Sequence, residues 1–266
     1  MAPGLGELEN MAKEQDEESL PVAFGSSFSD RTIRMSFIRK VYSIIFIQLL
    51  VTTLIVAPVI FSKNIKNFMC QTDPYVSIIT EGCVYSTQAY ILYGVSYVMF
   101  IITYLAIACC ERVRRKSPGN VIALSILTLA MSMLVAIICL FHDVVWVMMA
   151  MGITSALCLG LTLFSIQTKI DFTGIGPYLF VACWCLFVFG IMAIIVALTT
   201  GLTILSNVYS SLAALLFSLF LIFDTQRIMG GKKHSISPED YIWASIEIYI
   251  DIVYIFVAIL GIGGRN

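Results

Sequence analysis

Apolar residues occur along the chain in successive long blocks, which short polar or glycine-containing segments separate. Each block contains 21 to 24 residues. A helix of about 20 residues, rising about 1.5 Å per residue, crosses the roughly 30 Å hydrocarbon layer of a membrane. The pattern therefore predicts seven membrane-spanning helices, at residues 41–61, 89–110, 121–141, 144–166, 178–198, 204–227 and 241–262.

The composition agrees with a membrane protein, since 59% of the residues are hydrophobic and 12% are charged. A typical soluble domain has about 25% charged residues and about 45 to 50% apolar residues. We therefore predict an all-α integral membrane protein, in which residues 31–266 form one seven-helix membrane domain. The last two spans contain charged residues, which oppose membrane insertion. A re-entrant hairpin is therefore an alternative prediction for the seventh segment.

The distribution of lysine and arginine predicts how the chain is oriented in the membrane. Twelve of these residues near the span ends fall on one side, and three fall on the other. Because short basic loops stay in the cytoplasm, the N-terminus is predicted to be cytoplasmic. Residues 1–30 contain seven acidic residues and one lysine, which predicts a disordered acidic tail. This charge balance disfavours nucleic acid as a partner.

The eight cysteines show no spacing typical of metal ligands. Six of them lie in or at the ends of apolar spans, where cysteine is an ordinary small hydrophobe, and no structural metal or cofactor is expected. Cys70 and Cys83 instead flank one polar loop. They would form a disulfide if the loop faces an oxidising lumen, and two free thiols are the equal alternative.

Three acidic residues lie within the last two predicted spans: Asp224 in the sixth, and Glu247 and Asp251 in the seventh. Ionisable residues inside a membrane are costly and usually functional. Glu247 and Asp251 are four positions apart, so they share one face of the helix with Tyr254. The seventh helix is therefore expected to have one polar face among apolar ones.

Asp224 and Asp251 are equidistant from the segment that connects the two spans, so an antiparallel helix pair would place them level near the middle of the membrane. Two carboxylates at low dielectric cannot both ionise cheaply, and are expected to share a proton and titrate together. Such a pair can bind a cation when deprotonated and release it when protonated. Oxygen ligands suit Ca²⁺ and H⁺, so Asp224 and Asp251 are the predicted ion-binding residues, with Glu247 as an auxiliary carboxylate.

A structural alternative remains open for these acids. They are then neutral, or paired with arginines near the cytoplasmic ends of the spans, and merely hold the helices together. The candidate arginines are Arg112, Arg114, Arg115 and Arg227.

Several motifs, in order, resemble the transmembrane Bax-inhibitor-motif family. Three lie near the C-terminus, namely Phe223-Asp224-Thr225-Gln226, Ser237-Pro238-Glu239-Asp240-Tyr241 and the segment 248–256. Further matches resemble the lifeguard branch of the family, and they are Arg39-Lys40-Val41-Tyr42, Cys109-Cys110 with the segment 113–118, and the segment 167–172. The resemblance extends from about residue 31 to residue 266.

This resemblance implies a seven-helix bundle with a central last helix, a pH-sensitive Ca²⁺ leak from intracellular stores, and suppression of apoptosis. It matches Asp224 and Asp251 to the paired aspartates of the family, and Arg114 or Arg115 to an arginine that latches the pair. Glu247 departs from the family pattern, which usually has an uncharged polar residue there. The implied location is the Golgi or the endoplasmic reticulum, and the implied partners are apoptosis regulators or intracellular calcium-release channels.

We therefore expect a membrane protein without enzymatic activity that acts as a passive Ca²⁺ leak through the lipid bilayer of an intracellular store, with H⁺ binding as its gate. A calcium/proton antiporter and a non-conducting scaffold that regulates death receptors or calcium channels are the alternatives. An intramembrane aspartyl protease would also use paired aspartates. The chain lacks the Gly-x-Gly-Asp element of such an enzyme, and its aspartates lie in uninterrupted apolar segments.

Overall fold

The structure is a computed structural model that describes residues 5–71, 84–201, 204–231 and 233–263. Of residues 5–30, 71, 84 and 85, only the course of the backbone is described. Within the described ranges, seven helices are long and apolar enough to cross a membrane. They are α1 (Leu5–Phe61), α3 (Thr87–Cys109), α5 (Gly119–Cys139), α6 (Val144–Gln167), α7 (Gly176–Thr200), α8 (Ile204–Met229) and α9 (Tyr241–Ile262).

Short elements connect these helices. The helix α2 (Lys63–Met69) follows α1, and α4 (Glu111–Arg115) follows α3. A 3₁₀ turn, η1 (Pro238–Asp240), precedes α9 directly. Two short strands, β1 (Cys70–Gln71) and β2 (Val84–Tyr85), pair antiparallel, with Cys70 opposite Tyr85. The seven helices confirm the predicted all-α membrane bundle, and six of them both begin and end within about two residues of the predicted spans.

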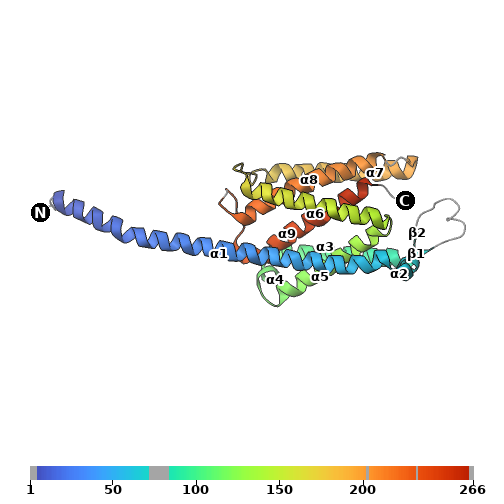
Figure 1. The fold of residues 1–266 in the computed structure, drawn as a ribbon, viewed down its shortest axis with the longest axis horizontal. Coiled ribbons are helices and arrows are strands. Elements are labelled where there is room, and N and C mark those ends of the chain that lie inside the picture. The colour runs from blue at the N-terminus through green and yellow to red at the C-terminus, as the bar shows by residue number, and fades with distance from the viewer. Residues whose placement is uncertain (1–4, 72–83, 202–203, 232, 264–266) are drawn as a thin grey trace.

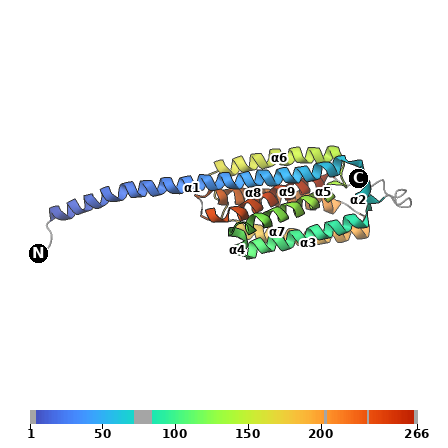
Figure 2. The same cartoon turned by 90° about the horizontal axis from the view of Figure 1, so that it is seen from below.

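The first helix is the exception. It begins at Leu5 rather than near residue 41, and its N-terminal part projects away from the other helices (Figure 1 and Figure 2). In the structure, residues 5–30 continue the helix of the first span, and the disorder predicted for residues 1–30 stays a prediction. Local helix propensity gives a physical reason, because much of the segment 5–19 consists of Glu, Leu, Met, Ala, Lys and Gln, which favour helix.

The last helix occupies the middle of the bundle (Figure 1 and Figure 2). It packs against α8, α1, α6 and α5. In its most apolar stretch, 56% of the residues are buried. The same value holds for α5, whereas the other spanning helices have 28% or less. Its buried isoleucines point in several directions around the axis, among them Ile242, Ile246, Ile248 and Ile255. A helix that is apolar almost all round is buried on all sides, so the expected central last helix is confirmed.

The course of α9 also decides between the two predictions for the seventh segment. It is one continuous helix over 22 residues, about 33 Å long at 1.5 Å per residue. This length suffices to cross the hydrocarbon layer, whereas a re-entrant hairpin reverses within the membrane. The hairpin alternative is therefore wrong for this structure.

The loop between the short strands bears on the cysteine prediction. Cys70 is disulfide-bonded, which favours the disulfide over a free thiol at this position. Cys83, its expected partner, lies outside the described residues. Six other cysteines are free thiols, namely Cys109, Cys110, Cys139, Cys158, Cys183 and Cys185.

Candidate functional site

The antiparallel pair of α8 and α9 brings the two predicted aspartates together. Asp224 on α8 has 4% of its surface exposed, and Asp251 on α9 has 5%. Their carboxyl groups lie close enough for one to donate a hydrogen bond to the other when it carries a proton. The two residues are therefore level along the helix pair, as their equal separation from the connecting segment predicts.

Arg227 completes this cluster. It lies three residues after Asp224 on α8, and its Nη1 donates a hydrogen bond to Asp224 Oδ1 at 2.7 Å. The same nitrogen donates to Glu247 Oε1, on α9, at 3.0 Å. The side chain of Glu247 is 15% exposed, and that of Arg227 is 23% exposed. One guanidinium thus bridges carboxylates of two different helices.

The charges of this cluster do not balance. When all groups are ionised, three carboxylates surround one guanidinium, which leaves two negative charges in a largely buried place. Such an excess costs free energy at low dielectric unless protons or a cation offset it. Among the described residues, Glu247 Oε2 and Asp251 Oδ2 are buried and have no hydrogen-bond partner. These two oxygens are free to accept a proton, a water molecule or a cation.

Aromatic side chains cover the cluster on the side of α3. The ring of Tyr104 on α3 lies 5.7 Å from that of Trp243 on α9. On the side of α8, the rings of Phe217 and Tyr254 stack with centroids 4.7 Å apart. Aromatic rings thus pack against both α8 and α9, the helices that carry the acids.

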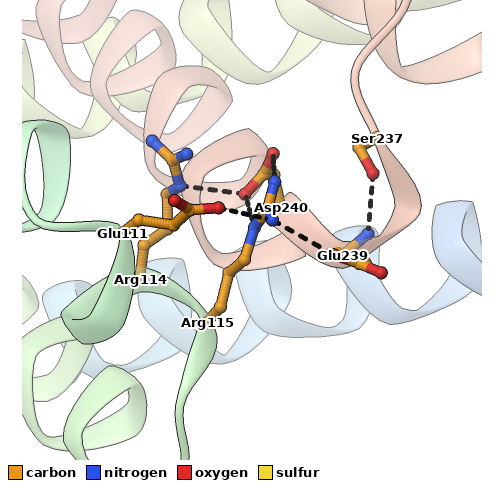
Figure 3. Close-up of polar contacts among 6 residues, drawn as sticks. All are labelled: Glu111, Arg114, Arg115, Ser237, Glu239 and Asp240. Atoms are coloured by element: carbon orange, nitrogen blue, oxygen red, sulfur yellow. Dashed lines mark hydrogen bonds and ion pairs between the residues drawn. The ribbon is translucent and has the colours of Figure 1, made fainter.

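The two arginines expected to latch the aspartates lie elsewhere. Arg114 Nε and Arg115 Nε each donate to Asp240 Oδ1 at 2.9 Å, and Arg115 Nη2 donates to Asp240 Oδ2 at 3.1 Å (Figure 3). Arg115 also pairs with Glu111 at 2.6 Å and with Glu239 at 3.2 Å. We call these five residues the cytoplasmic clamp, after the predicted orientation.

The position of the clamp on the helices explains why Arg114 and Arg115 do not contact Asp224 or Asp251. Asp240 and Asp251 are eleven positions apart, which is about 16 Å along a helix, beyond the reach of an arginine side chain on α4. The hydrogen bond with Asp240 raises the pKa of Arg115, so that Arg115 stays charged at any physiological pH. In this structure the arginine that contacts the acids is Arg227, one of the partners in the structural alternative.

A permanent metal site is not apparent in the part of the chain that the structure describes. No group of three or more His, Cys, Asp or Glu residues there has an arrangement that could hold a metal ion. Ca²⁺ requires about six to eight oxygen ligands, so Asp224 and Asp251 would need backbone carbonyls or water to complete its coordination. The arrangement fits a transient cation better than a tightly bound one.

Three residues that hold the cytoplasmic ends of the helices in place were not predicted as functional candidates. Asp240 was noticed only within a motif, although an acid at the start of an apolar span is itself a signal. Gln226, 1% exposed, receives a hydrogen bond from Phe172 N at 2.8 Å and donates one to Ile170 O at 3.0 Å. It thereby fixes the loop between α6 and α7 to α8, next to Arg227.

Arg34 of α1 is the third. Its guanidinium donates to the carbonyl oxygens of Ile236 at 2.7 Å, Arg227 at 3.2 Å and Met229 at 3.4 Å. The last carbonyls of a helix have no partner within the helix and carry its partial negative charge. Arg34 therefore caps α8 at its C-terminal end and holds the backbone of the residue that bridges the acids.

A second buried polar cluster lies on another side of α9. Tyr249 and Ser132 each lie within hydrogen-bonding distance of the Thr52 hydroxyl, at 2.9 and 3.0 Å, and Gln48 Nε2 donates to Thr128 Oγ1 at 3.0 Å. These groups join α1, α5 and α9 through neutral hydrogen bonds. Of these two buried clusters, the charged one lies at the interface between α8 and α9 and the neutral one joins α1, α5 and α9.

The fold and this site define a class: a seven-helix membrane protein whose central last helix carries buried acids against its neighbour. Comparison of the sequence with known proteins agrees. The model of the family described as "Inhibitor of apoptosis-promoting Bax1" matches residues 34–266. The chain belongs to this family of anti-apoptotic membrane proteins.

Similar proteins come from the lifeguard branch. The chain is 38% identical to human Protein lifeguard 3 over 253 residues, which cover 94% of this chain and 76% of the relative. It is 39% identical to mouse Protein lifeguard 3 over 239 residues, covering 90% and 72%. Identity with mouse Protein lifeguard 4 is 33% over 228 residues, covering 86% and 84%. The resemblance stated from the motifs is thereby confirmed.

Proposed function

We propose that this protein is a pH-sensitive Ca²⁺ leak channel of intracellular membranes, and that its gate is the cluster of Asp224, Glu247, Asp251 and Arg227. One observation carries the proposal: Arg227 pairs with Asp224 and Glu247, Asp251 lies beside Asp224, and two oxygens of these three acids lack a hydrogen-bond partner among the described residues. A site of this kind attracts cations and responds to protons. Arg227 occupies the place that a permeating cation would take.

Opening would require Arg227 to leave the acids. It lies in the last turn of α8 and is the most exposed member of the Asp224–Arg227–Glu247 ion pairs, so its side chain can move towards the cytoplasmic end. Protonation of Asp224 or Glu247 weakens its attachment. Protonation of all three acids removes the attraction for Ca²⁺. Flux is therefore expected to rise as the pH falls, and to fall again when the last acid is neutralised.

The biological setting follows from the same proposal. The excess of basic residues at one end of the bundle supports a cytoplasmic N-terminus. A leak in the Golgi or endoplasmic reticulum would lower the stored Ca²⁺ and thereby suppress apoptosis. Apoptosis regulators or intracellular calcium-release channels are the partners that this role implies. No enzymatic step is proposed, because the acids lie in the continuous helices α8 and α9.

Ca²⁺ flux into liposomes tests the proposal directly. Purified wild type, Asp224→Asn and Asp251→Asn are compared from pH 5 to pH 8, with Asp143→Asn as a matched control at the exposed start of α6. We expect pH-dependent flux in the wild type and the control, and a flattened pH dependence in both dyad variants. Wild-type flux no greater than that of empty liposomes would overturn the proposal.

A non-conducting scaffold is the second candidate, and the ion pairs of Arg227 favour it. They are the contacts expected if the acids only hold α8 to α9. Under this alternative, the Asp251→Asn variant retains its protection against apoptosis when the folded protein is expressed at the wild-type level. An antiporter would differ from both candidates, because Ca²⁺ would then move only when protons move in the opposite direction.

A further inference from the structure

We propose that Cys109 and Cys110 are sites of reversible S-acylation by a long-chain fatty acid. The two thiols are adjacent, free and exposed at the C-terminal end of α3. The exposed charged residues Glu111 and Arg112 follow directly, so the hydrocarbon layer must end at this pair. Cysteines at the boundary between a membrane span and the cytoplasm are the usual position of this modification.

The side of the membrane is set by the proposed orientation, on which this inference rests. The end of α3 lies beside Arg114, Arg115 and the start of α9, among the basic residues that the orientation places in the cytoplasm. Thiols remain reduced there, and acyl-coenzyme A is available. The cysteine sulfur attacks the acyl carbonyl, a thioester forms, and the coenzyme A thiol leaves with the proton, so that no oxidant or reductant is required.

The outer face of α3 provides a place for the acyl chain. Large apolar side chains that are each more than half exposed recur at intervals of three and four residues from Cys109 backwards. This spacing places them on one face of the helix, and the stripe is about 27 Å long at 1.5 Å per residue. Its members are Leu105, Ile102, Val98, Val95 and Ile91.

The direction of the cysteine side chain agrees with this stripe. The Cα–Cβ bonds of a helix tilt towards its N-terminus, and the N-terminus of α3 is at the opposite side of the membrane. A chain attached to Cys109 therefore starts along the stripe and into the lipid. Cys110 ends the helix with an extended backbone, and its carbonyl accepts hydrogen bonds from Val113 N and Arg114 N at the start of α4. Acylation would thus fix the turn that carries the cytoplasmic clamp to the membrane.

The chain contains a matched control. Cys183 and Cys185 are also free and exposed, but they lie seven and nine positions into α7, which begins at Gly176. At 1.5 Å per residue they are about 10 to 14 Å inside the span. An enzyme acting at the cytoplasmic surface cannot reach that depth. We therefore expect no acylation of Cys183 and Cys185, although both thiols are exposed.

The experiment labels the full chain in cultured cells with an alkyne-bearing palmitate analogue. We expect wild type and Cys183→Ser/Cys185→Ser to carry label that neutral hydroxylamine removes, and Cys109→Ser/Cys110→Ser to lose at least about nine tenths of it. Absence of hydroxylamine-sensitive label on the wild type, or full label on the Cys109→Ser/Cys110→Ser variant, overturns the proposal.

A second measurement needs no substitution. Mass spectrometry of the labelled wild-type protein should find the acyl group on the peptide that contains Cys109 and Cys110, and an acyl group only on the α7 peptide would contradict the assignment. Failure of this proposal and failure of the proposed channel can be told apart. Ca²⁺ flux is measured on protein produced in bacteria, which carries no acyl group, so its outcome does not depend on acylation.

Discussion

Arg227 on α8 donates a hydrogen bond to Glu247 on α9 across 3.0 Å, and so connects the two helices that carry the buried acids. The same guanidinium nitrogen holds Asp224 at 2.7 Å. Arg227 thus supplies the positive charge between the two helices that carry the acids. The arginines near the end of α3 pair with Asp240 in this structure, and their expected role as a latch for the aspartates stays a prediction.

Replacing Arg227 by methionine should destabilise the protein in a pH-dependent way. Three carboxylates would then face one another without a cation, and removal of one partner from a buried pair costs about 3 to 5 kcal/mol. Because Arg227 is 23% exposed, we expect a smaller loss, of about 1 to 3 kcal/mol at pH 7. Thermal unfolding in detergent measures it, and the loss should shrink as the pH falls and the acids take up protons.

The charge-conserving variant Arg227→Lys is the control for this prediction. It keeps a cation between Asp224 and Glu247, and should lose less stability than Arg227→Met at pH 7. A methionine variant whose unfolding temperature is unchanged, or whose loss does not depend on pH, would show that the acids are already protonated around Arg227.

The cytoplasmic clamp predicts unequal effects of its two neighbouring acids. Asp240 is 14% exposed and accepts hydrogen bonds from Arg114 and Arg115, whereas Glu239 is 72% exposed and pairs with Arg115 alone. Asp240→Asn should therefore lower the free energy of unfolding by about 1 to 2 kcal/mol. Glu239→Gln should lower it by less than about 0.5 kcal/mol. Thermal unfolding at low and at high salt distinguishes them, and equal losses would contradict the geometry.

The two glycines after α8 form another matched pair. Gly230 and Gly231 both have positive φ, of 72° and 75°, so alanine is strained at either position, by about 1 kcal/mol. A Cβ on Gly230 would also collide with the Arg34 guanidinium, whereas a Cβ on Gly231 meets nothing within 4 Å. Gly230→Ala should therefore destabilise the protein more than Gly231→Ala, in the same unfolding measurement. A larger loss for Gly231→Ala would indicate that Arg34 can move away.

Much of the fold could be predicted because the membrane imposes a length on each helix. Blocks of apolar residues fixed the seven helices, and equal separation from a short connection placed Asp224 level with Asp251. The length of α1 could not be predicted in this way. Its extension from residue 5 depends on local helix propensity, whereas the low hydrophobicity and high charge of the same segment indicated disorder.

The partners of the acids were harder to predict than the acids themselves. Four arginines were candidate partners, and sequence spacing does not tell which of them faces the acids. Arg227 had a local signal, since it follows Asp224 by three positions on the same helix face. In the structure, α4 turns Arg114 and Arg115 towards Asp240 at the start of α9, about 16 Å along the helix from Asp251, and their role as a latch stays a prediction.

Glu247 offers the sharpest test of how many protons control the proposed channel. The variant Glu247→Gln leaves Asp224, Asp251 and the Asp224–Arg227 pair in place, but lowers the excess negative charge of the ionised cluster from two to one. Since a neighbouring negative charge makes ionisation of the remaining acids less favourable, its removal should let them ionise at lower pH. The flux–pH curve of Glu247→Gln should therefore shift to lower pH and become less steep. Liposome flux from pH 5 to pH 8 measures both, with Glu239→Gln as the exposed control. A wild-type curve for Glu247→Gln would exclude Glu247 from the gate and leave it a structural partner of Arg227.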